Sequence, residues 1–156
     1  MELSKHCGEK FEGTASVTPE NKPEDAFLGK KLTMHIASCS ANEIRVPFAI
    51  GENHSRTWII RYDPVAGLSL KHEHRHEDGS LEFIAYGGIA RNGGSTHAQF
   101  FPTDPETIKA SPITATNVWM LTLAEDGNTF KYDIDRFGKP LYRTEMRKMR
   151  ADVTSK

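Results

Sequence analysis

Short runs of β-forming residues, each ended by a turn signal, constrain the fold of this chain more than any other feature. From Leu32 onward we expect strands over residues 32–37, 44–50, 56–62, 68–77, 81–87, 95–101, 117–124, 129–136 and 140–147. Turn-forming residues separate them, at Asp63-Pro64, Asp78-Gly79, Asn92-Gly93-Gly94, Asp126-Gly127 and Gly138. No stretch keeps a 3.6-residue hydrophobic period, so the pattern argues against a mainly helical fold.

A closed sheet is the arrangement that suits these runs best, because closure removes exposed sheet edges. Residues 11–17 offer one further candidate strand near the start of the chain. We therefore predict an all-β fold, an antiparallel meander β-barrel of about eight to nine strands, similar to lipocalins and calycins. The length of 156 residues suits one barrel domain over residues 1–156, with a loosely ordered segment at about 1–10 and a tail at about 149–156.

Two short helices are expected beside the strands. Residues 23–28 begin with Pro and two acids and are followed by Gly29, which is typical of a helix. Residues 105–110 follow Asp104, which can cap a helix, and begin with Pro105 at the first helical position.

Three histidines alternate along the run 68–77 and mark the first candidate site. Successive strand residues point to opposite faces, so His72, His74 and His76 share a face with Leu68 and Leu70. The opposite face carries Ser69, Lys71, Glu73, Arg75 and Glu77 and is expected to meet water. The three imidazoles should therefore point into the barrel.

Three interpretations of these histidines remain open. Neutral imidazoles can form a hydrogen-bonded structural or pH-responsive network, since burial disfavours the charged form. They can instead recognise an organic ligand. Two imidazoles about 6.5–7 Å apart can also share a metal ion such as zinc or iron, with His97 or His35 supplying another ligand.

Aromatic residues complete the candidate ligand-binding set. Trp58 and Trp119 are suited to lining an apolar cavity, although a purely structural core is the simpler role for each. Tyr132 shares a strand face with Phe130 and Ile134, and Tyr86 precedes two glycines. Gly87 and Gly88 are expected in a turn or bulge, because no helix follows to make a phosphate-binding loop.

Charge and cysteine content narrow the function classes. Lys and Arg total 20 against 21 Asp and Glu, so the basic surplus of a general nucleic-acid-binding protein is missing. No apolar run approaches the roughly 18 residues of a membrane-spanning helix. Cys7 and Cys39 allow one disulfide or two reduced thiols. The start of the chain fits either a cytoplasmic protein or a mature form after removal of a signal peptide.

Several segments together resemble a family of uncharacterised bacterial exported proteins. They are Ser55–Trp58, the run Gly67-Leu68-Ser69-Leu70-Lys71-His72-Glu73-His74-Arg75-His76-Glu77-Asp78-Gly79, then Tyr86-Gly87-Gly88, Phe101–Asp104 and Asn117–Trp119. The resemblance covers roughly residues 27–147, and it implies a periplasmic or secreted protein made with a signal peptide. It implies no catalytic residue.

The sequence thus predicts a small-molecule-binding β-barrel with a histidine-lined interior pocket. The predicted ligand contacts are His72, His74, His76, Trp58, Tyr86, Trp119 and Tyr132, and the predicted metal ligands are His72, His74, His76 and His97. The alternative is a histidine-dependent enzyme, with or without a divalent metal, that acts as a hydrolase, isomerase or lyase on a small organic substrate.

Overall fold

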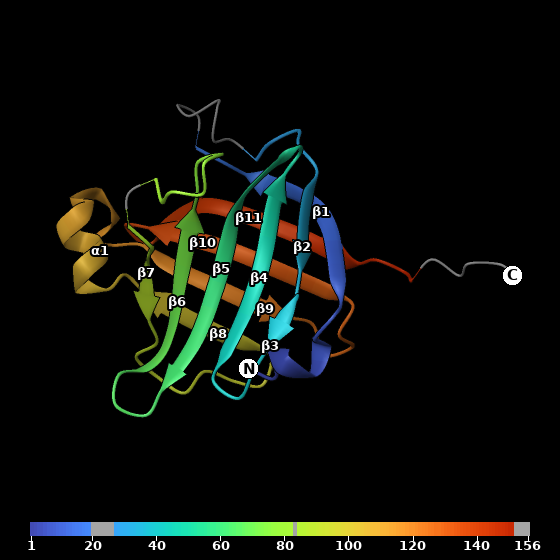
Figure 1. Cartoon of the computed structure of the whole chain (residues 1–156), viewed down its shortest axis with the longest axis horizontal. Helices are drawn as coiled ribbons and strands as arrows, with labels where there is room; N and C mark the ends of the chain where they lie inside the picture. The colour runs from blue at the N-terminus through green and yellow to red at the C-terminus, as the bar shows by residue number, and fades with distance from the viewer. Residues whose placement is uncertain (20–26, 83, 152–156) are drawn as a thin grey trace, which may run out of the picture.

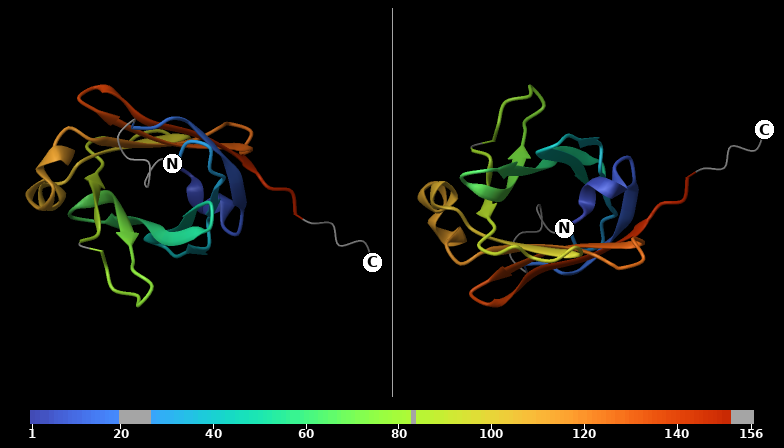
Figure 2. Two further views of the ribbon diagram at one scale, coloured as in Figure 1. Left: turned by 90° about the horizontal axis from the view of Figure 1, so that it is seen from above. Right: turned by 90° about the horizontal axis from the view of Figure 1, so that it is seen from below.

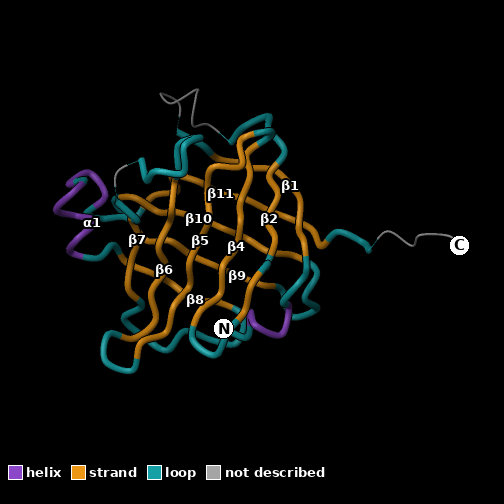
Figure 3. The backbone as a smooth tube through the Cα atoms, in the orientation of Figure 1, coloured by secondary structure: helices purple, strands orange, loops and turns teal. Residues whose placement is uncertain are grey.

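The computed structural model of the chain describes residues 1–19, 27–82 and 84–151 (Figure 1). Helical structure in this part is limited to the α-helix α1 (Pro105–Ala110) and two 3-10 turns, η1 (Leu3–His6) and η2 (Pro112–Thr114) (Figure 3). The strands are β1 (Lys10–Val17), β2 (Leu32–His35), β3 (Ser38–Cys39), β4 (Glu43–Ile50), β5 (Asn53–Asp63), β6 (Gly67–His74), β7 (Tyr86–Ile89), β8 (Ala98–Pro102), β9 (Val118–Leu123), β10 (Thr129–Arg136) and β11 (Lys139–Lys148).

The strands form one antiparallel sheet that curls into a nearly closed barrel (Figure 2). The order around the sheet is β7-β6-β5-β4-β2-β1-β11-β10-β9-β8, so neighbours in the sequence are neighbours in the sheet and β1 pairs with β11. β7 and β8 meet across the remaining seam through a bridge between Gly88 and Thr103. The all-β meander barrel expected from the sequence is therefore confirmed.

The number of strands is larger than the eight or nine predicted. Ten strands follow one another around the sheet, and β3 pairs with β4 beside them. The sequence pattern of β1 is a weak indication of a strand, because only Phe11 and Ala15 of its eight residues are buried. Gly13 lets β1 lie close to β11, since a Cβ there would overlap the carbonyl oxygen of Glu145.

Three local predictions differ from the structure. The run predicted over residues 68–77 ends at His74, because a turn closed by the bond from the Gly79 N–H to the His76 carbonyl follows. The strand predicted over 81–87 is replaced by β7, so Gly87 and Gly88 lie in a strand and not in a turn. The helix expected over residues 23–28 lies mostly outside the described residues, and Phe27 and Leu28 are not helical.

The helix predicted over residues 105–110 is confirmed and closes the seam beside β7. The Asp104 carboxylate caps α1 by accepting a hydrogen bond from the Thr107 N–H at 2.8 Å, and it pairs with Lys71 Nζ at 2.8 Å. Burial raises the pKa of Asp104, but the bonds from Lys71 and Thr107 outweigh it and leave the pKa below its usual value. The Thr107 hydroxyl also accepts from the Gly87 N–H at 2.8 Å.

Gly87 permits β7 to approach β6, and its replacement tests the seam. A Cβ at Gly87 would overlap the carbonyl oxygen of Leu70, which belongs to the neighbouring backbone and has no rotamer to change. We expect Gly87→Ala to lower the free energy of unfolding by about 2 kcal/mol, as measured by urea unfolding. Gly93→Ala is the matched control, because nothing lies within 4 Å of a Cβ there, and it should change stability by less than about 0.5 kcal/mol. Equal effects of the two substitutions would contradict this account.

The lower end of the barrel, where the N-terminus lies in Figure 1, is covered by the first residues of the chain. Leu3 is 2% exposed and packs in the hydrophobic core, and the Glu2 N–H donates to the Thr96 carbonyl at 2.9 Å. Cys7 and Cys39 form a disulfide with Cα atoms 6.2 Å apart. The segment predicted to be loosely ordered over about residues 1–10 is thus fastened to the barrel.

The other end of the chain contributes little to the barrel after β11. Residues 149–151 are outside any strand, and the rest of the predicted tail is beyond the described residues. Within the described ranges, no helix is long and apolar enough to cross a membrane.

Candidate functional site

A cavity of about 500 Å³ occupies the upper end of the barrel, opposite the N-terminus. Its wall combines aromatic, polar and charged side chains from strands that are distant in the sequence. The lining residues are Phe27, Arg56, His74, Glu82, Tyr86, Ser111, Thr114, Asn117, Trp119, Tyr132, Ile134, Arg136, Leu141 and Tyr142. The size is within the range of small-molecule sites in proteins.

His72 lies beneath this cavity and is held by two hydrogen bonds. The Tyr86 carbonyl can only accept, so Nδ1 carries the proton and donates to it at 3.1 Å. Burial, with smaller contributions from Arg56 and Lys71, outweighs that bond and lowers the pKa of His72 to about 4. The imidazole is therefore neutral at pH 7, and its Nε2 is an acceptor.

Tyr132 connects His72 to the cavity wall through a hydrogen bond. Because Nε2 of His72 accepts, the Tyr132 hydroxyl donates to it, at 2.8 Å. Burial raises the pKa of Tyr132 well above its usual value, which keeps the proton on the hydroxyl. The lone pairs of the Tyr132 oxygen can therefore accept a hydrogen bond from another donor.

Trp119 brings an unusual buried donor to the same wall. The residue is 2% exposed, and its indole Nε1 makes no hydrogen bond of good geometry with any described residue, although it lies beside the Tyr132 hydroxyl. Buried donors without a partner are rare in native proteins, since each costs about 1–3 kcal/mol. The cavity therefore presents a hydrogen-bond donor that a bound molecule can satisfy.

Charged side chains stand around the upper part of the cavity. His74 Nδ1 pairs with the carboxylate of Glu82. The guanidinium of Arg136 is oriented by a bond from Nε to Asn117 Oδ1 at 2.8 Å. Arg56 is half-buried, and its charge contributes to the pKa shifts of both His72 and Tyr132.

The predicted ligand contacts divide into three groups. His74, Tyr86, Trp119 and Tyr132 line the cavity. His72 is 3% exposed and lies below them, and Trp58 lies deeper, stacked on Tyr132 with ring centroids 4.4 Å apart. His76 is exposed in the turn beyond β6, because β6 ends at His74, three residues before the end of the predicted strand.

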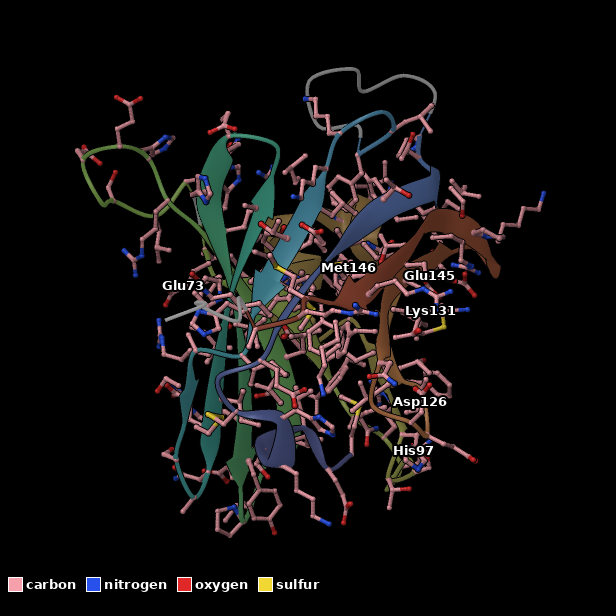
Figure 4. The ribbon with its side chains drawn as sticks, turned by 90° about the vertical axis from the view of Figure 1, so that its right-hand side faces the viewer. Glu73, His97, Asp126, Lys131, Glu145 and Met146 are labelled. Carbon is pink, nitrogen blue, oxygen red and sulfur yellow. A yellow bond between two sulfur atoms is a disulfide. The ribbon has the colours of Figure 1, made fainter. Side chains whose placement is uncertain are left out.

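The four histidines proposed as metal ligands do not meet. His97 lies at the lower end of the barrel with Asp126, far from Glu73 on β6 (Figure 4), and its carbonyl accepts from Leu123 N–H at 2.8 Å. His72 is enclosed by Tyr86 and Tyr132, and His76 is outside. Among the residues that the structure describes, no group of three or more His, Cys, Asp or Glu side chains is arranged to hold a metal ion. The predicted metal set is therefore not assembled as one site.

The sequence interpretation missed the two arginines and Asn117. Strand alternation carries a signal for both arginines: Arg56 shares its face with Trp58, and Arg136 shares its face with Tyr132 and Ile134. Asn117 carried a similar signal, because it begins the strand predicted over 117–124 and shares a face with Trp119, although in the structure it precedes β9.

The fold and the cavity together define an antiparallel β-barrel with a mixed aromatic and polar pocket at one end. No protein-family model, curated protein or solved structure matches the chain. Functional inference therefore depends on the chemistry of this pocket.

Proposed function

We propose that this protein binds a small organic molecule in the cavity at the upper end of the barrel. The observation that carries the proposal is the buried Trp119 Nε1 in the wall of a cavity of about 500 Å³, where a ligand acceptor would complete its hydrogen bonding. Tyr86, Trp119, Tyr132 and Tyr142 offer ring surface to the body of a ligand. A lipocalin-like role, in which a barrel holds a ligand in its mouth, is consistent with this arrangement.

Filling the cavity is the direct mutational test. Leu141 lines the cavity and is only partly buried, so Leu141→Trp should occupy ligand volume without disturbing the core. With the neutral fluorescent probe N-phenyl-1-naphthylamine, we expect the dissociation constant to rise by about tenfold or more, which is about 1.4 kcal/mol. Fluorescence titration measures it.

Val65→Trp is the matched control for this substitution. Val65 is 97% exposed in the turn between β5 and β6 at the lower end, so the same indole is added away from the cavity. Probe affinity should be unchanged in this variant. A probe that binds Leu141→Trp as tightly as the parent protein would contradict the cavity as the binding site.

We also propose that the protein works outside the cytoplasm, in the periplasm or as a secreted protein. The Cys7–Cys39 disulfide supports this location, because disulfides persist in oxidising compartments and are rare in the cytosol. The resemblance to bacterial exported proteins points the same way. Mass spectrometry of the protein recovered from its host, by compartment and without reduction, tests this; a cytoplasmic pool with both thiols free would contradict it.

An enzyme that uses the same cavity is the second candidate, and the His74–Glu82 pair is the observation that favours it. The Glu82 carboxylate accepts from His74 Nδ1, an arrangement that orients the imidazole and leaves Nε2 free of the proton, as general-base catalysis requires. If this candidate is right, the protein should hydrolyse p-nitrophenyl esters at least about 100-fold faster than its His74→Gln variant, the usual contribution of a general base. Equal rates would contradict it for ester hydrolysis.

A further inference from the structure

The charges around the cavity favour one class of ligand. Among the residues that the structure describes, the charged side chains that line it are Arg56, His74, Glu82 and Arg136. Glu82 supplies the carboxylate of this set, and it is paired with His74 and is 48% exposed at the side chain. The guanidinium of Arg136, whose side-chain partner is the neutral Asn117, therefore adds a positive charge to the wall that a bound anion would neutralise.

Arg136 has the geometry of an anion-binding side chain. Its Nε bond to Asn117 Oδ1 fixes the plane of the guanidinium, and Asn117 is itself only 4% exposed. The terminal nitrogens of Arg136 make no hydrogen bond or ion pair within the described part of the chain. A guanidinium held in this way can offer parallel N–H groups to the two oxygens of a carboxylate.

One neutral group on the wall also selects for an acceptor. The indole N–H of Trp119 can only donate a hydrogen bond. The wall also includes the rings of Phe27, Tyr86 and Tyr142. Tyr142 is stacked on Phe27 with centroids 4.6 Å apart, and Tyr86 is stacked on His72 at 4.8 Å. Such surfaces suit a flat apolar body.

We propose that the ligand is a small, flat organic acid, whose carboxylate pairs with Arg136 and whose apolar body lies against the tyrosine and tryptophan rings. This inference rests on the proposed function, because it names the ligand class of the same cavity. The carboxylate would be exchanged reversibly, with no covalent step.

A matched pair of probes tests the acid separately from the cavity. 2-Naphthoate and 2-naphthamide have the same ring system and nearly the same shape, and only the first is an anion. By isothermal titration calorimetry at neutral pH and low salt, we expect the parent protein to bind the naphthoate about tenfold more tightly than the amide. In Arg136→Met this preference should fall below about threefold, while affinity for the amide stays within about twofold of the parent value.

Two further variants make the result specific. Arg136→Lys keeps the charge but not the planar pair of donors, so it should retain part of the preference. Arg91→Met removes an exposed arginine from the loop between β7 and β8 at the lower end and should retain all of it. Circular dichroism confirms that each variant is folded before titration.

The outcomes separate this inference from the function on which it depends. Equal affinity of the parent protein for naphthoate and naphthamide, or an undiminished preference in Arg136→Met, would overturn the organic-acid class and leave a binding cavity. If neither compound binds and N-phenyl-1-naphthylamine does not bind either, the proposed function itself fails. If only N-phenyl-1-naphthylamine binds, the cavity is retained and the acid class is overturned.

Discussion

Replacement of both Cys7 and Cys39 by serine is expected to lower the free energy of unfolding by about 4 kcal/mol. The disulfide joins residues 32 positions apart, and a loop of that length restricts the unfolded chain by about this amount in the chain-entropy description. It also ties the segment that carries Leu3 to β3, so its loss frees the lower end of the barrel. Urea unfolding followed by tryptophan fluorescence gives the change in free energy.

Reduction of the parent protein provides the control for the double substitution. The parent protein with its thiols reduced and alkylated should lose a similar amount, which separates the effect of the crosslink from that of the serine side chains. A loss below about 1 kcal/mol in both preparations would show that the N-terminal segment is held by packing alone.

The second large effect is a loss of stability in mild acid that arises from His72. Its pKa is about 4 in the folded protein, against an ordinary value of 6.5 in the unfolded chain. Between these two values the unfolded chain binds a proton that the folded protein does not. The contribution of the buried, neutral His72 to the free energy of unfolding is therefore complete above pH 6.5. It is lost as the pH falls toward 4, by about 3 kcal/mol in total.

A glutamine at position 72 isolates this contribution. The side chain of His72→Gln can still donate and accept, but it does not titrate, so the variant should be less stable at neutral pH and should lose less stability on acidification. His54→Gln, which removes an exposed histidine, should keep the pH dependence of the parent protein. Urea midpoints across this pH range provide the comparison. Parallel curves for the parent protein and His72→Gln would contradict a buried neutral imidazole.

The alternation of residues along β6 was sufficient to predict which face its residues 71 and 72 occupy. His72 was expected to face the interior and Lys71 the exterior, and the structure places them in this way, because one buried sheet face fixes the register of a strand. The Asp104 cap and Pro105 in the first turn were also sufficient to predict α1, since both act within a few residues of the helix. Local chemistry determines such features, so a single sequence contains them.

Features that depend on barrel closure were harder to predict. A candidate strand over residues 11–17 was expected, and β1 lies there, but its pairing with both β2 and β11 is a property that its own sequence does not display. The cavity likewise joins Arg56 of β5 to Arg136 of β10, which become neighbours only when the sheet curls. The end of β6 at His74 is set by a turn, so His76, which alternation placed inside, is exposed.

The hydrogen bonds beneath the cavity give its wall a fixed polarity. The Tyr132 hydroxyl donates to His72, and His72 donates to the Tyr86 carbonyl, so the position of each of these protons is fixed. A wall with fixed donors and acceptors needs little rearrangement when a ligand binds, which favours affinity. The Trp119 N–H, which makes no hydrogen bond of good geometry with the described residues, is then the group whose surroundings change most.

The indole N–H resonance of Trp119 is therefore the most direct probe of ligand binding in this cavity. In nitrogen-labelled protein, the Trp58 and Trp119 indole signals can be assigned with a Trp119→Phe variant and followed as N-phenyl-1-naphthylamine or 2-naphthoate is added. We expect a saturable shift of the Trp119 signal, and a smaller one for Trp58, which lies deeper against Tyr132. A Trp119 signal that stays in place while signals from the lower end of the barrel move would contradict ligand binding in this cavity.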